Sequence, residues 1–212
     1  MKFRRKPRVE GDGVAGPTAL TPSFGAPQRT DVVTMGPYDE KDAPEAERAD
    51  LGSLLIAPGP GRDVRLQVDQ KTQRVQAVII TGAEGAIELR AFAAPRNGDL
   101  WAETRPMIAA ETVRRGGSAT EQEGRFGPEL RCEVTVQRPD GTTVLQPSRV
   151  VGINGPRWML RATILGRPVA DAEAAAEWED VLAGVVVRRG EEAMAVGDAL
   201  PITVPEQARR VQ

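Results

Sequence analysis

The sequence contains no histidine and only one cysteine, Cys132. Histidine is the most common general base and metal ligand, so its absence excludes Ser-His-Asp and Cys-His catalysis. A single cysteine cannot form an intramolecular disulfide, a CxxC redox pair or a cysteine zinc site within the chain. We therefore expect no cofactor and a cytoplasmic location.

Lysine and long apolar runs are also scarce. The lysines are Lys2, Lys6, Lys41 and Lys71, and none lies in the apolar setting that a Schiff-base role requires. No run approaches the roughly 18 apolar residues of a transmembrane helix, so no membrane span is expected. The chain starts with basic residues as a secretory signal does, but Gly, Asp and Pro follow in place of an apolar segment. We expect no export.

Residues 1–50 predict a disordered, charged tail, because Gly and Pro are frequent and the apolar residues follow no period of 2 or 3.6. Its acidic residues lie just before the domain, and its basic residues lie at the start: Lys2, Arg4, Arg5, Lys6 and Arg8. This basic cluster has two interpretations. It is either a solvated leader or a weak, salt-dependent anchor for RNA, DNA or anionic lipid.

Residues 51–206 have the patterns of a folded domain, followed by a flexible C-terminus at 207–212. Alternation of apolar and polar residues predicts strands at 63–69, 75–81, 87–93, 129–137, 148–153 and 157–165, with short extended segments at 185–187 and 201–205. Helical spacing predicts one helix within 97–115, capped by Asn97 or Asp99, and another from Pro168 to about Leu182. This order predicts an α+β fold, a single antiparallel sheet with two main helices packed against it.

Three groups suggest chemistry but have simpler interpretations. Cys132 lies on the apolar phase of its strand, which indicates a core thiol. Gly59-Pro60-Gly61 matches no phosphate-binding motif and indicates a turn. Glu177, Glu179 and Asp180 surround Trp178 but straddle several faces of the predicted helix, which indicates a solvated helix surface.

Arginines next to aromatic residues are the candidates for a partner-binding site. Arg96 precedes the helix that carries Trp101, and Arg157 and Arg161 flank Trp158 on the polar phase of their strand. Planar cations beside large rings are typical of binding faces. The alternative is ordinary packing, in which arginine stems cover the tryptophan rings.

Several motifs together carry a family resemblance: Ala91-Phe92-Ala93-Ala94-Pro95-Arg96, Leu100-Trp101, Gly124-Arg125-Phe126-Gly127, Glu129-Leu130, Val151-Gly152-Ile153-Asn154-Gly155-Pro156-Arg157-Trp158 and Leu200-Pro201. They resemble an actinobacterial family known as domain of unknown function 3710, over roughly residues 51–205. The resemblance implies no activity, cofactor or catalytic residue. The element order is also similar to that of Mog1/PsbP-type domains, which bind protein partners, but this is an analogy of fold alone.

Three functions remain open from the sequence. The first is a non-catalytic protein-binding or adaptor module, favoured by the missing histidine and the arginine–aromatic pairs. The second is binding of nucleic acid or an anionic surface through the basic tail. The third is an enzyme that uses carboxylates or a divalent metal, a class that works without histidine.

Overall fold

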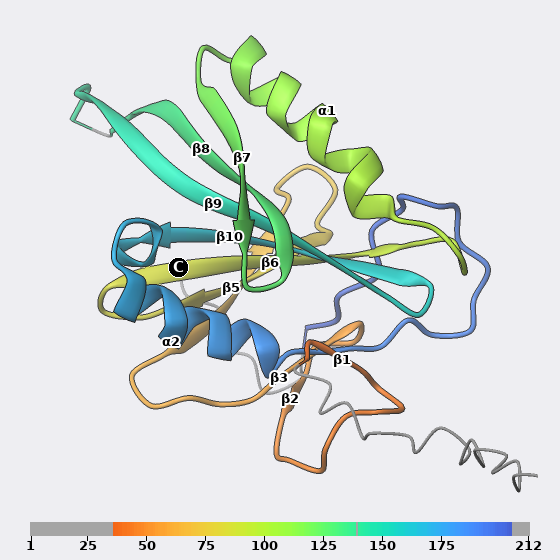
Figure 1. Cartoon of the computed structure of the whole chain (residues 1–212). Helices are drawn as coiled ribbons and strands as arrows, with labels where there is room; N and C mark the ends of the chain where they lie inside the picture. The colour runs from red at the N-terminus through yellow and green to blue at the C-terminus, as the bar shows by residue number, and fades with distance from the viewer. Residues whose placement is uncertain (1–35, 139, 205–212) are drawn as a thin grey trace, which may run out of the picture. The chain divides into compact units, whose positions relative to one another are not determined.

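The computed structural model describes residues 36–138 and 140–204. In this part of the chain most of the regular structure is β-strand, arranged in a seven-stranded and a four-stranded sheet with two α-helices (Figure 1). The single-sheet α+β fold expected from the sequence is therefore wrong, although both expected helices are present.

The large sheet is antiparallel throughout and has the strand order β4-β5-β6-β10-β9-β8-β7. Its strands are β4 (Asp63–Val68), β5 (Val75–Thr81), β6 (Gly85–Ala93), β7 (Ser118–Gly124), β8 (Gly127–Gln137), β9 (Thr143–Gly155) and β10 (Trp158–Gly166). The two meanders, β4 to β6 and β7 to β10, meet where β10 pairs with β6. Six of these strands were expected, and β7 was not, because its sequence SATEQEG has no apolar alternation.

The small sheet has the order β1-β11-β3-β2, with β1 (Tyr38–Asp39), β2 (Ala49–Asp50), β3 (Leu54–Ile56) and β11 (Val186–Val187). β1 runs parallel to β11, and the other pairs are antiparallel. Residues 36–50, which the sequence placed in the tail, thus contribute two strands to a sheet. A two-residue strand is too short to show a period, so only its long-range pairing reveals it.

Both helices begin at an aspartate cap. In α1 (Leu100–Arg114) the carboxylate of Asp99 accepts a hydrogen bond from the amide of Ala102, as one of the sequence predictions expected. Pro106 lies inside this helix. The second helix, α2 (Ala172–Ala183), starts later than expected, because Pro168 lies in a short 3₁₀ turn, η1 (Arg167–Val169), and Asp171 caps the helix instead.

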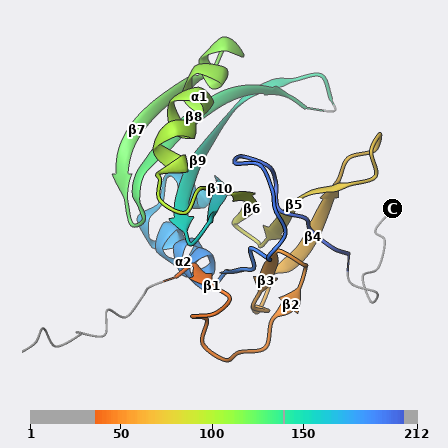
Figure 2. The ribbon, with the colours of Figure 1, turned by 90° about the vertical axis from the view of Figure 1, so that its right-hand side faces the viewer.

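The helices lie on opposite faces of the large sheet, so that sheet has two cores. One core joins β5, β6 and β10 to α2 and the small sheet, through residues such as Leu54, Leu89, Leu160 and Trp178. The other lies under α1, which contacts β7, β8 and β9 (Figure 2). Other parts of the protein therefore cover both faces of the central strands in part. A polar side chain on either face can contact protein as well as water.

Candidate functional site

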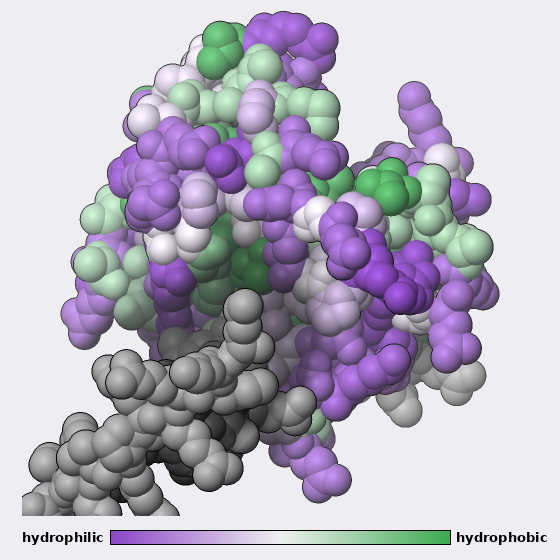
Figure 3. Space-filling model, turned by 45° about the vertical axis from the view of Figure 1, so that its right-hand side comes forward, coloured by the Kyte–Doolittle hydropathy of each residue, from purple (hydrophilic) through white to green (hydrophobic). Residues whose placement is uncertain are grey.

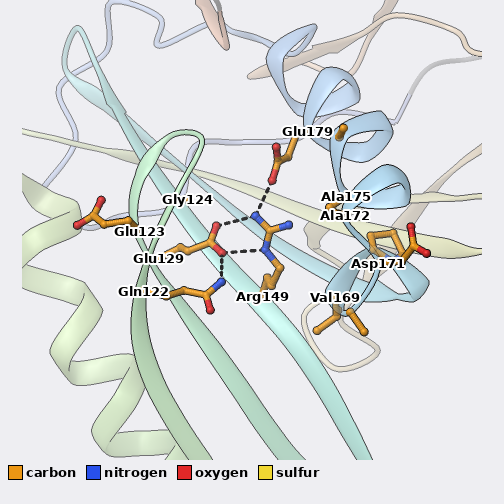
Figure 4. Close-up of a pocket in the computed structure, with 13 residues that line it drawn as sticks. Gln122, Glu123, Gly124, Glu129, Arg149, Val169, Asp171, Ala172, Ala175 and Glu179 are labelled. Atoms are coloured by element: carbon orange, nitrogen blue, oxygen red, sulfur yellow. Dashed lines mark hydrogen bonds and ion pairs between the residues drawn. The ribbon is translucent and has the colours of Figure 1, made fainter.

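A pocket of about 410 Å³ lies on the α2 side of the large sheet (Figure 4). Its walls come from the end of β7, the start of β8 and the middle of β9 on one side and from η1 and α2 on the other. Six residues define this α2 pocket: Gln122, Glu129, Arg149, Asp171, Ala175 and Glu179.

A buried ion network forms one wall of the α2 pocket. Nε and Nη2 of Arg149 donate hydrogen bonds of 2.8 and 2.9 Å to the two carboxylate oxygens of Glu129. The same Nη2 donates to Glu179 at 2.6 Å, and the amide of Gln122 donates to Glu129 at 2.7 Å. Glu129 is 0% exposed and Arg149 is 7% exposed. The network therefore links three strands of the sheet to α2.

The guanidinium of Arg149 is the centre of this network. Hydrogen bonding to Glu129, supplemented by Glu179, outweighs burial and holds the pKa of the Arg149 guanidinium above its ordinary value. Both carboxylates accept hydrogen bonds from the one guanidinium of Arg149, which is permanently charged. The hydrogen bonds of the network therefore cross-link the sheet to α2.

A larger cleft, of about 770 Å³, lies on the opposite face of the sheet beside α1. We call it the α1 cleft and define it by six of its residues: Arg90, Phe92, Met107, Ile108, Met159 and Arg161. Strands β6 and β10 form its floor and α1 forms one wall. Met107 on that wall is 62% exposed, so the cleft presents an apolar side chain to solvent. Figure 3 shows one face of the domain, which is mostly hydrophilic with a few separate hydrophobic areas.

Arg161 is the unusual group in the α1 cleft. Its guanidinium carbon lies 5.1 Å from the centroid of the Phe92 ring, a cation–π distance. Among residues 36–138 and 140–204 it forms no ion pair within 4 Å and no hydrogen bond, although it is only partly exposed. Burial, together with the nearby charge of Arg90, lowers the pKa of Arg161 from its ordinary value. The cleft thus holds a cation that has no anionic partner among the residues that the structure describes.

The other cations of the cleft have partners. Arg90 donates to Glu88 at 2.7 Å and lies 3.4 Å from the side-chain oxygen of Gln67. Arg115 at the end of α1 donates to Glu111 at 2.7 Å. Arg161 is therefore the cleft arginine whose charge is not compensated by a neighbouring carboxylate in the described part of the chain.

The four residues expected to form a partner-binding face lie in different surroundings. Arg96 is exposed in the loop before α1, and Arg157 lies in the β9–β10 turn with a positive φ of 64°. Trp101 is 3% exposed and its indole nitrogen donates to the carbonyl of Pro128 at 2.6 Å. Arg161 faces the α1 cleft. Within the described residues no hydrogen bond, ion pair or cation–π contact joins any two of these four.

The grouping of Arg161 with Trp158 does not match the structure. Trp158 points into the α2-side core and its indole nitrogen donates to Asp39 at 2.8 Å. Arg161 lies three positions later on the opposite face of β10, where the ring beside it is Phe92 of β6. Alternation along a strand indicates this separation, but the partner ring on the neighbouring strand follows only from the register of β6 and β10.

Other sequence interpretations have mixed outcomes. Cys132 is buried as expected, and burial raises the pKa of its thiol. The expected solvated acidic surface of α2 holds for Glu177 and Asp180, whose side chains are 66% and 72% exposed. It is wrong for Glu179, whose side chain is 13% exposed and binds Arg149.

The network residues Glu129 and Arg149 were missed because each occupies a strand position next to apolar residues, where alternation suggests a solvent-facing side chain. The signal that could have found them is the presence of two helices beside the sheet. If each helix covers one face, polar side chains on either face of a strand can be buried.

The remaining candidates concern the tail and metal binding. Lys2, Arg4, Arg5, Lys6 and Arg8 lie outside the described residues. Within residues 36–138 and 140–204, no three His, Cys, Asp or Glu side chains come together as a metal site would require. Neither helix in the same ranges has the length and apolarity of a membrane span.

Comparison with protein-family models gives a match over most of the chain. A family model described as "Protein of unknown function (DUF3710)" matches residues 36–211. The match starts earlier than the segment that carried the resemblance in the sequence, and it includes β1 and β2. No curated protein matches the chain.

Proposed function

The chain belongs to the DUF3710 family, whose description assigns no activity, and we propose from its own geometry that the domain is a non-catalytic module that binds a protein partner. The observation that carries the proposal is the α1 cleft, where an exposed apolar wall adjoins an arginine without an anionic partner among the described residues. Clefts with apolar linings and a few polar groups are the usual places of ligand binding. Exposed methionine suits such a surface because its unbranched side chain adapts to different partners.

The structure of the α2 pocket supports the non-catalytic part of the proposal. Its two convergent carboxylates, Glu129 and Glu179, are both engaged by Arg149. Acid–base catalysis needs a group within hydrogen-bond reach of the substrate, whereas both oxygens of Glu129 and one oxygen of Glu179 already accept hydrogen bonds from Arg149. The proposal also includes a cytoplasmic location, supported by the free thiol of Cys132.

The test is a pair of charge insertions on the same helix. Met107→Glu places a carboxylate on the wall of the α1 cleft, and Val113→Glu places one on α1 at a position that does not line the cleft. Both side chains are well exposed, at 62% and 59%, so neither change should unfold the domain. The full-length protein and both variants are used for affinity purification from nuclease-treated lysate. We expect a stoichiometric partner to be retained by wild type and Val113→Glu and lost by Met107→Glu.

Two results would contradict the proposal. If Met107→Glu retains the partner as well as Val113→Glu does, the α1 cleft is not the binding surface. If nuclease or the exchange of Arg4 and Arg5 for glutamine removes all binding, the basic tail is the functional element and polyanion binding is the better account.

A further inference from the structure

The charges around the α1 cleft determine what a partner must supply. Arg90 and Arg115 already donate to Glu88 and Glu111, each at 2.7 Å. Arg161 forms no such pair within the described residues, and Glu88, the acid that attracts it from farther away, is bonded to Arg90. One negative charge on the partner is therefore enough to pair with the guanidinium of Arg161, whereas a polyanion would need several free cations to bind.

The position of Arg161 also limits where that negative charge can lie. The guanidinium stacks over Phe92, and the apolar side chains of Met107, Ile108 and Met159 line the same cleft. A group that reaches Arg161 has to enter between these apolar surfaces. Its anionic atom must therefore be flanked by apolar groups that replace the water on Phe92 and Met107.

The energetics favour a carboxylate at this place. Burial disfavours the charged form of Arg161, but an arginine remains protonated, and among the described residues only the Phe92 ring and the more distant Glu88 compensate part of the cost of desolvation. A carboxylate accepts two parallel N–H hydrogen bonds from a guanidinium, and such bidentate pairs are among the stronger interactions in partly buried sites. A bound carboxylate thus offsets the cost of desolvating Arg161, which the free domain carries.

We infer that the α1 cleft binds a partner segment in which one Asp or Glu, with apolar residues next to it, pairs with Arg161 while its neighbours pack on Phe92 and Met107. This inference rests on the proposed function, because it names the chemistry of the partner at that same cleft. It goes further in assigning specificity for an acidic–apolar segment to one residue, Arg161.

The experiment is selection of random 12-residue peptides displayed on phage, with the full-length protein as the target. Four targets are compared: wild type, Arg161→Gln, Met107→Glu and the control Arg65→Gln, which removes a charge from the exposed edge strand β4. Peptides enriched by wild type are then synthesised with their Asp or Glu intact or exchanged for Asn or Gln, and their affinities are measured by fluorescence anisotropy.

We expect wild type and Arg65→Gln to select peptides with Asp or Glu beside Leu, Ile or Phe, and Met107→Glu to bind none of them. Exchanging the acid for its amide should weaken binding to wild type roughly 10- to 100-fold, the usual worth of a charge-assisted hydrogen bond. The same exchange should change binding to Arg161→Gln less than about threefold. The circular dichroism spectrum of Arg161→Gln should match that of wild type and its Tm should be no lower, because no ion pair of the described residues is lost and the desolvation cost of the charge is removed.

The outcomes separate failure of this inference from failure of the proposed function. Peptides that depend on Met107 but carry no acid, or acidic peptides that bind Arg161→Gln as tightly as wild type, would overturn the inference and leave the proposed function standing. If no selected peptide is sensitive to Met107→Glu, the cleft is not a peptide-binding surface, and both statements fail.

Discussion

Glu129→Gln should be one of the most destabilising conservative changes in the described part of the domain. Glu129 is 0% exposed and both of its carboxylate oxygens accept hydrogen bonds from Arg149. Glutamine keeps the shape of the side chain but has one acceptor oxygen and an NH₂ group, which is a donor facing the donors of Arg149. At least one of the two charge-assisted bonds is lost and the buried guanidinium loses half of its countercharge.

The expected size of the effect follows from this geometry. Each hydrogen bond to a charged group contributes about 1.5–3 kcal/mol, and removal of one partner from a buried ion pair costs about 3–5 kcal/mol. Because Glu179 still holds Arg149 at 2.6 Å, we expect the lower end, a loss of about 3 kcal/mol in the free energy of unfolding. For a domain of this size that corresponds to a decrease of about 6–12 °C in Tm.

The assay is urea unfolding of the full-length protein at pH 7, followed by tryptophan fluorescence, with Glu111→Gln as the matched control. Glu111 also pairs with arginine, but its side chain is 36% exposed and its arginine partners lie on the surface. Exposed helix pairs contribute about 0.3–0.5 kcal/mol. A loss below about 1 kcal/mol for Glu129→Gln, or one equal to that of Glu111→Gln, would refute the conclusion that the buried pair of Glu129 and Arg149 stabilises the fold.

The remaining predictions concern packing and pH. Gly152→Ala should lower the free energy of unfolding by about 1–3 kcal/mol, because a Cβ at this position would collide with the indole ring of Trp101. Gly184→Ala, where a Cβ meets only ordinary contacts, should change stability by less than about 1 kcal/mol, and equal effects in thermal melting would argue against the close packing of Trp101.

The hydrogen bond from Arg188 lowers the pKa of Asp50 in the folded protein. The contribution of this bond to the free energy of unfolding is therefore complete above the unfolded pKa of about 3.9, and it is lost as the pH falls through the pKa of the folded state. Asp50→Asn should therefore be slightly less stable at pH 7 and show a shallower decline of Tm below about pH 4, and parallel curves for variant and wild type would contradict this linkage.

The sequence alone determined most of the local structure of the domain. Alternation between apolar and polar residues located six strands of the large sheet, and helical spacing located α1, with Asn97 and Asp99 as the candidate caps. These features depend on residues close together in the chain, which is why a pattern can reveal them. The apolar phase of residues 129–137 likewise placed Cys132 in the core.

Only the tertiary structure decided how these elements combine. The extended segment at 185–187 was expected from the sequence, but the strand β1 and its pairing with β11 were not, because they join segments almost 150 positions apart, as Tyr38 and Val186 show. The separate cores on the two faces of the large sheet put Glu129 and Arg149 inside the protein, although their strand phase suggested water. Arg161 was a candidate from the sequence, but its neighbours Phe92 and Met107 come from another strand and from α1. Contacts between distant segments depend on strand register and packing, and a local sequence pattern does not determine either.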